Sequence, residues 1–192
     1  MLLVYTSKIT PRLKFVFKQI CTRILNIPVS FTNVIEEFIA HDHLKMSYGS
    51  QPLGSEFFVR SNGLLSEQGL SDLELNVQTW EDTKCFFSSG EKSHIPFDIF
   101  AAAFYLLSRY EEYLPHVKDV YGRFTKEESL AFQSGFLHQP VIDIWAYKFK
   151  AALQKQYPTQ EFGVRRFSIN PVIDVPVAYY FKNKGFLRTL GG

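Results

Sequence analysis

Residues 96–115, PFDIFAAAFYLLSRYEEYLP, limit the fold of this chain more than any other segment does. At 100° per residue the segment is apolar around most of its circumference, and Phe100, Phe104 and Leu107 share one stripe. A helix that is apolar on most sides has to be covered by other elements. We therefore expect a central core helix that starts at the first proline, carries Asp98 in its first turn and ends at the last proline.

Two other segments have the apolar spacing of helices that cover a core. Residues 10–26 begin with Thr10 as the predicted N-cap and Pro11 at the first helical position, and their apolar residues share one face. Residues 139–158 have Pro140 near their start and Pro158 at their end, and their apolar residues, which include Trp145, share the face expected to point inward. We expect a helix in each segment.

The fold class follows from the strands around these helices. Residues 2–6 and 27–33 are short apolar runs joined by the first helix, and a right-handed crossover makes such strands parallel. Residues 34–90 contain shorter runs punctuated by glycine, a pattern typical of antiparallel strands. We expect an α/β fold of the mixed α+β kind, whose central sheet has a parallel start and an antiparallel middle and is packed by about three main helices.

Composition excludes several classes of protein. The chain is 46% hydrophobic and 21% charged, which predicts a globular fold rather than disorder. A formal net charge of +2 provides no basic field, so we expect no nucleic-acid partner. Cys21 and Cys85 form no metal or redox motif, and no apolar run reaches the ~18 residues of a membrane span. We therefore expect a cytoplasmic protein without a membrane partner.

The sequence contains no motif of the common enzyme classes that we considered. It has no nucleophile elbow, no phosphate-binding P-loop and no dinucleotide-binding glycine motif. His41 and His43 are the only close histidine pair, and on a strand they could share a metal with a third ligand. The surrounding residues favour a solvated turn, so we expect no metal site.

A group of charged residues near the end of the central helix is the candidate binding site. Arg109, Glu111, Glu112, Arg123 and Asp143 could clamp a ligand or, as the least favoured alternative, form the active site of an independent enzyme. Glu111 falls within the apolar stripe, so its carboxylate needs a partner or must be neutral. We favour a structural role, in which the charged helix end is tied to the following loop through Arg123. The helix dipole explains Asp143, which lies in the first turn of its own helix.

Several segments resemble those of a known domain. They are SYGSQPLGSEFF, IPFDIFAAAFYLLSRYEEYLPHVKDVYGRF, SLAF, GFLHQPVIDIWAYKF and IDVPVAYYFKNKGFLRTLGG, and the likeness covers nearly the whole chain. The chain thus resembles an uncharacterised bacterial N-terminal domain that precedes a polysaccharide-deacetylase-like domain. With a linker-like composition at 159–166, the resemblance implies an α/β accessory domain over residues 1–165. It also implies the first strand of a truncated deacetylase-like domain over residues 166–192.

The resemblance also assigns a role to Asp174. In such deacetylases the first strand supplies an aspartate as general base and a second carboxylate that binds the metal, and later histidines complete the metal site. Asp174 occupies the base position on a strand expected at 168–181, but Pro176 replaces the second carboxylate and no histidine follows His138. We expect no cofactor in this chain, and a divalent, zinc-like metal only where a complete deacetylase domain follows. The alternative role for Asp174 is to cap the end of a strand.

Three functions are compatible with the sequence. The first is a non-catalytic accessory domain of a carbohydrate-deacetylase-like protein, whose partners are the missing deacetylase domain or carbohydrate. The second is a free-standing binding or scaffold protein that has lost its catalytic half, and the third is the independent enzyme named above. The resemblance makes the accessory domain the favoured function of the three. The sequence does not fix the oligomeric state.

Overall fold

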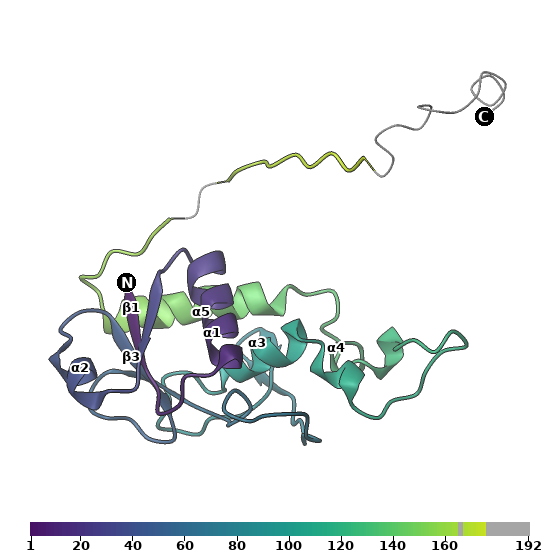
Figure 1. The fold of residues 1–192 in the computed structure, drawn as a ribbon, viewed down its shortest axis with the longest axis horizontal. Coiled ribbons are helices and arrows are strands. Elements are labelled where there is room, and N and C mark those ends of the chain that lie inside the picture. The colour runs from purple at the N-terminus through teal and green to yellow at the C-terminus, as the bar shows by residue number, and fades with distance from the viewer. Residues whose placement is uncertain (165–166, 176–192) are drawn as a thin grey trace, which may run out of the picture.

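The structure is a computed structural model that describes residues 1–164 and 167–175 (Figure 1). Its main sheet has four parallel strands in the order β2-β1-β3-β4. These strands are β1 (Leu2–Tyr5), β2 (Val29–Thr32), β3 (Lys45–Gly49) and β4 (Phe57–Arg60). A second, antiparallel sheet pairs β5 (Gln78–Trp80) with β6 (Thr83–Cys85). The expected mixed α+β class is confirmed.

Three of the helical elements in the described residues are α-helices of seven or more residues, as the sequence predicts, and the others are shorter or of other helical types. The elements are α1 (Pro11–Phe17), the π-helix η1 (Lys18–Ile24), α2 (Ile35–Ala40), α3 (Ile99–Leu107), the 3-10 helices η2 (Tyr110–Tyr113) and η3 (Lys126–Glu128), α4 (Leu130–Gln133) and α5 (Val141–Gln156). Thr10 caps α1 as predicted, because its hydroxyl accepts a hydrogen bond from the Leu13 N–H at 3.1 Å.

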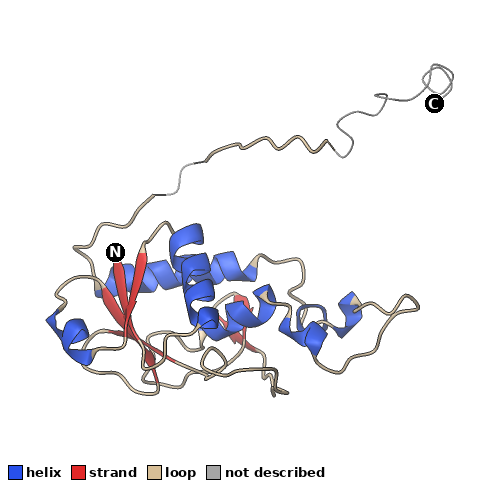
Figure 2. Ribbon diagram, in the orientation of Figure 1, coloured by secondary structure: helices blue, strands red, loops and turns tan. Residues whose placement is uncertain are grey.

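The core lies between one face of the main sheet and the three long helices (Figure 2). Phe17 of α1 stacks on Phe100 of α3 with ring centroids 3.6 Å apart, and it meets Tyr48 of β3 edge-on at 5.4 Å. Phe149 of α5 contacts both Phe57 of β4 and Phe100, at 5.7 Å and 5.4 Å between ring centroids. The aromatic residues that are frequent in the sequence therefore join the helices to the sheet.

The opposite face of the main sheet is covered more thinly. Side chains alternate between faces along a strand, so Tyr5 and its register partner Ser47 point away from the helical core. Phe38 of α2 packs against Tyr5 with ring centroids 5.5 Å apart. The connection between β3 and β4, residues 50–56, covers the rest of this face near Ser47.

The central helix is confirmed, but its ends differ from the prediction. Residues 99–103 of α3 are fully buried. Asp98 is the N-cap rather than a first-turn residue, because its carboxylate accepts hydrogen bonds from Phe100 N and Ala101 N. The helix ends at Leu107, well before Pro115, because Arg109 adopts a left-handed conformation with φ 52°.

The middle of the chain differs from the sequence prediction in two places. Short strands were expected along residues 34–90, but the helix α2 forms near their start. The Thr32 hydroxyl accepts from Val34 N just before α2 and donates to Glu37 Oε2 at 2.7 Å. Among the described strands, the antiparallel pair is β5 with β6, whereas β3 and β4 pair in parallel across residues 50–56. Parallel neighbours usually need a crossover of about a dozen residues or more, so this link is unusually short.

The chain beyond α5 forms no helix or strand among the described residues. Gly163 O accepts a hydrogen bond from Lys150 Nζ at 3.0 Å, which holds the start of this segment on α5. Residues 167–175 are exposed along their whole length. The strand expected at 168–181 is therefore not formed up to Val175, and its remainder, including Pro176, lies outside the described residues.

Candidate functional site

The break after α3 positions the charged residues of the candidate binding site. The left-handed Arg109 turns the chain into η2, which carries both glutamates. Arg109 forms an ion pair with Glu112 through its Nη2 and Oε1 atoms, as the i, i+3 spacing predicts, with the guanidinium exposed. An ion pair in this position contributes little to the stability of the fold, because water screens it.

Glu111 has the partner that its position in the apolar stripe requires. Its Oε2 accepts a hydrogen bond from the backbone N–H of Leu130, the first residue of α4, at 2.9 Å. Burial raises the pKa of Glu111, and the neighbouring Glu112 carboxylate raises it further. The predicted structural role of Glu111 therefore corresponds to a direct link between η2 and α4.

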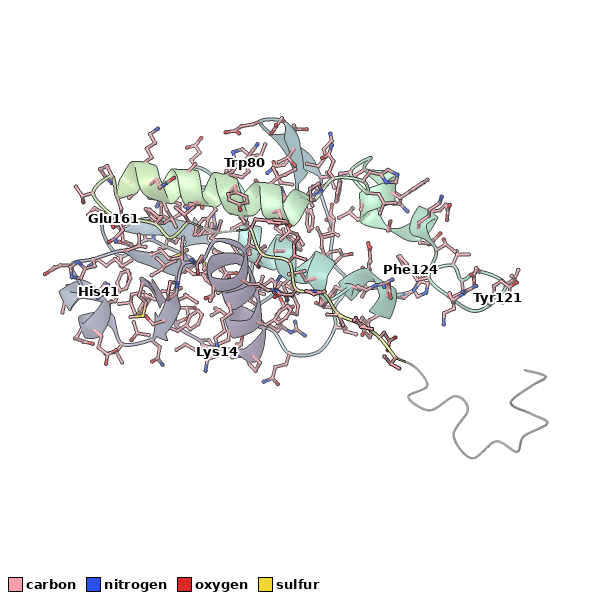
Figure 3. The ribbon with its side chains drawn as sticks, turned by 90° about the horizontal axis from the view of Figure 1, so that it is seen from above. Lys14, His41, Trp80, Tyr121, Phe124 and Glu161 are labelled. Atoms are coloured by element: carbon pink, nitrogen blue, oxygen red, sulfur yellow. The ribbon has the colours of Figure 1, made fainter. Side chains whose placement is uncertain are left out.

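Arg123 does not make the link that the sequence suggested. Its Nε lies 3.4 Å from Asp119 Oδ2, and its guanidinium lies over the Tyr121 ring, 4.6 Å from the centroid. Asp119 Oδ1 also accepts hydrogen bonds from Tyr121 N and Arg123 N. The prediction that Arg123 ties the helix end to its loop is wrong, because local contacts within this turn occupy the side chain. Figure 3 shows Tyr121 at the tip of the projecting loop.

Pockets lie on both sides of Glu111. One, of about 340 Å³, is lined by Arg109, Glu111 and Glu112. The other, of about 250 Å³, is lined by Glu111 together with Asp72, Glu128 and His116. The structure thus brings three of the five predicted binding residues to one pocket, while Arg123 lines none of the described pockets.

Asp143 is separate from this group. It lies exposed in the first turn of α5, as predicted, beside an apolar hollow of about 220 Å³ that Phe136 and Pro140 also line. The five predicted residues therefore do not form one constellation. No single described pocket brings all five of them together.

Asp98 is the most extensively hydrogen-bonded buried carboxylate of the described residues, and the sequence analysis placed it in the first turn of a helix without including it among the site residues. Its side chain is fully buried, and its Oδ2 accepts from the Tyr48 hydroxyl and from Asn62 N, both at 2.7 Å. Its Oδ1 accepts from Phe100 N and Ala101 N at 3.1 Å and 3.0 Å. An aspartate directly before an apolar helical run is an N-cap signal, which could have revealed that the backbone at the helix start donates to this carboxylate.

The environment of Asp98 also changes its acidity. Burial raises the pKa of Asp98 to about 6, although the four hydrogen bonds to its carboxylate oppose this effect. With both oxygens occupied, Asp98 joins β3, the residues after β4 and the start of α3. Its hydrogen bonds thus give it a structural role rather than leaving it available to a ligand.

The histidine pair is remote from these residues. The His41 and His43 rings lie 5.7 Å apart in an edge-on arrangement just after α2, and Figure 3 shows His41 at the opposite end of the molecule from Tyr121. Across residues 1–164 and 167–175, no group of three or more His, Cys, Asp or Glu side chains is arranged to hold a metal ion. Asp174, in the exposed segment after α5, therefore belongs to no such group of described side chains.

Comparison with known proteins gives one match. A family model described as a family of unknown function (DUF7033) matches residues 2–158, which end just after α5. No curated protein and no solved structure matches the chain. Within the described part of the chain, no helix is long and apolar enough to cross a membrane.

Proposed function

We propose, on the premise that this chain belongs to the family of unknown function DUF7033, that its folded part is a non-catalytic accessory domain of a polysaccharide-deacetylase-like protein. The accessory domain corresponds to residues 1–165, and the residues after it belong to the deacetylase-like part. The proposal places the protein in the bacterial cytoplasm, because both of its cysteines are free and buried.

The exposure of the segment after α5 carries this proposal. Residues 167–175 contain large apolar side chains whose exposed fractions run from 60% at Val175 to 89% at Phe167 and Val172. So many apolar residues in one short segment are typical of a strand that is buried on both faces. Since the described residues leave the segment uncovered, its natural packing partner is a further domain.

The residues of this chain do not provide the ligands that a deacetylase uses to bind its catalytic metal. Asp174, the counterpart of the general base, is exposed, and the sequence has Pro176 where a second carboxylate would bind the metal. No reaction step is therefore assigned to this chain. In this proposal its partners are the deacetylase-like domain and carbohydrate.

Acetate release tests the proposed absence of catalysis. The purified 192-residue chain should release no acetate from acetylated oligosaccharides, with or without added Zn²⁺. Metal-dependent release of acetate, abolished by Asp174→Ala, would contradict the proposal. A related metal-dependent deacetylase assayed in parallel would show that the substrate and the metal were adequate.

A free-standing binding or scaffold protein is the second candidate. The loop after η2 favours it, because Val117, Val120 and Tyr121 are all more than 70% exposed there. The mass of the protein in its native cells, detected with an antibody against residues 2–158, separates the two candidates. A mass well above 22.2 kDa supports the accessory domain, and a mass of 22.2 kDa supports the free-standing protein.

A further inference from the structure

The main sheet has a topological switch point between β1 and β3. From β1 the chain passes through α1 and η1 to β2 on one side, whereas from β3 it passes through residues 50–56 to β4 on the other. The two connections therefore diverge from neighbouring parallel strands at their carboxyl ends. In open parallel sheets, ligands bind in the crevice outside the strand ends at such a point.

A pocket of about 230 Å³ lies at this switch point. Tyr5 and Ser7 line it from the end of β1, and residues 47–53 line it from the end of β3 and the connection that follows. Ligand pockets commonly measure about 300–1,000 Å³, so this one suits a single ring rather than a long molecule. It lies on the thinly covered face of the sheet, where Tyr5 is partly exposed.

The wall of the pocket is held in place by a buried carboxylate. Glu56 is only 6% exposed, and its Oε1 accepts hydrogen bonds from the Leu53 N–H at 2.8 Å and from the Ser47 hydroxyl. Leu53 lies in the connection and Ser47 in β3, so Glu56 fastens the connection to the strand. The pocket is therefore preformed rather than dependent on a ligand to fold the connection.

The side chains that line the pocket are neutral and carry hydrogen-bonding groups. Tyr5, Ser7 and Ser50 contribute hydroxyl groups, and none of the lining residues is charged. Gln51 Oε1 accepts a hydrogen bond from Lys92 Nζ at 3.2 Å, so its amide nitrogen is the atom that can donate to a ligand. The Tyr5 ring adds an apolar surface beside these groups.

We propose that the pocket at the carboxyl ends of β1 and β3 binds a neutral, hydroxyl-rich ring of the size of one sugar unit. A charged ligand would lack a counter-charge in the lining, whereas hydroxyl and amide groups match the alternating donors and acceptors of a sugar. The ring can come from a free monosaccharide or from one unit of a longer glycan. All residues that line this site lie between Tyr5 and Leu53, so the site does not rely on the proposed link to a deacetylase.

Titration of the ¹⁵N-labelled 192-residue chain, followed by NMR, tests the proposal. The probes are N-acetylglucosamine, its β1,4-linked disaccharide and inorganic phosphate, each up to about 20 mM, which detects millimolar binding. We expect both sugars to cause saturable shifts in residues 5–8 and 47–53, and phosphate to cause none there. Tighter binding of the disaccharide would identify a glycan as the source, and equal binding would identify a free sugar.

Matched glutamine variants connect the binding to the pocket. Gln51→Ala should weaken sugar binding about fivefold, the loss expected for one neutral hydrogen bond, while Gln68→Ala, at another exposed glutamine, should not change it. The proposal is overturned if neither sugar shifts these residues, if phosphate alone does so, or if Gln51→Ala binds like the unmodified chain. Acetate release plays no part in this test, so its outcome is separate from that of the proposed function.

Discussion

Asp98 shows how one side chain can join three segments of this fold. Its carboxylate accepts hydrogen bonds from the Tyr48 side chain of β3, from the backbone after β4 and from the first turn of α3. Each of these donors would lose its partner inside the protein if the carboxylate were removed. Unsatisfied buried donors are costly, so the stability of the core depends on this residue.

The raised pKa of Asp98 predicts how stability depends on pH. Asp98 keeps its proton up to about pH 6 in the folded protein, whereas the ordinary pKa of an aspartate, which applies to the unfolded chain, is 3.8. Protonation of Asp98 therefore favours the folded state. Its contribution to the free energy of unfolding is fully present below about pH 3.8 and is lost as the pH rises through about 6. The free energy of unfolding of the wild type relative to Asp98→Asn should thus fall by about 3 kcal/mol between about pH 3.5 and pH 7.

Urea unfolding at several pH values measures this difference. Because Asp98→Asn lacks the titrating carboxyl group, subtraction removes the contributions of groups that the two proteins share. A difference that stays constant across this pH range would contradict the assigned pKa. The variant should also be less stable at low pH, since its amide NH₂ cannot accept from Asn62 N.

Glu111 and Glu112 are adjacent glutamates with different expected effects. Glu111→Ala should lower the free energy of unfolding by about 1 kcal/mol, because the Leu130 N–H loses its acceptor. Glu111→Gln should be milder, since the amide oxygen can still accept. Glu112→Ala removes only the ion pair with the exposed Arg109 and should cost less than about 0.5 kcal/mol.

Thermal unfolding together with hydrogen exchange at residues 129–134 distinguishes these glutamate variants. Faster exchange in Glu111→Ala but not in Glu112→Ala would locate the effect at the start of α4. Equal melting temperatures for Glu111→Ala and the wild type would contradict the structural role.

At the scale of elements, local signals predicted some helices and missed others. Thr10 and Pro11 predicted the start of α1 because a cap and its first turn lie within a few residues of each other. The short α2 was missed because its stability depends on Thr32 and on packing against Tyr5 of another element. The parallel pairing of β3 with β4 was also missed, because it depends on contacts between strands and not on the sequence of either strand alone.

The end of α3 depends on backbone conformation at a single residue. Arg109 has φ 52°, a region that costs about 1 kcal/mol for residues other than glycine. Arg109→Gly and Arg109→Ala both remove the ion pair, but only the alanine variant retains the backbone cost. The glycine variant should therefore be more stable than the alanine variant by about 1 kcal/mol in urea unfolding. Equal stabilities would show that this break in α3 is not strained.

At the scale of the whole molecule, the sequence predicted the class of fold better than the site. Apolar periodicity identified the core helices, and it also showed that Glu111 needed a partner. The identity of that partner, Leu130 N in α4, depends on how distant segments meet. Arg109, Glu111 and Glu112 came together because they are close in sequence, whereas Arg123 pairs with Asp119 and Asp143 lies beside a different pocket at the start of α5.

The proteolytic pattern of the molecule should follow the boundary after α5. Phe167 is 89% exposed in a segment without secondary structure, so a protease that cuts after aromatic residues should cleave there first. The large fragment should keep the melting temperature of the intact chain, because among the described residues none beyond Phe162 packs into the core. Mass spectrometry identifies the cut, and a lower melting temperature of the fragment would show that the segment contributes to the fold.

The short link between β3 and β4 also has a consequence for the order in which the chain folds. Met46 pairs with Phe57, whereas Leu3 pairs with the more distant Lys45 and Leu2 with Val29. Closing a smaller loop loses less chain entropy, so β3 and β4 are the strands of the main sheet that can meet earliest. We expect this pair to form first and the β1–β2 pair, which closes the next smallest loop, to form second. The contact between β1 and β3 then joins the two pairs into one sheet.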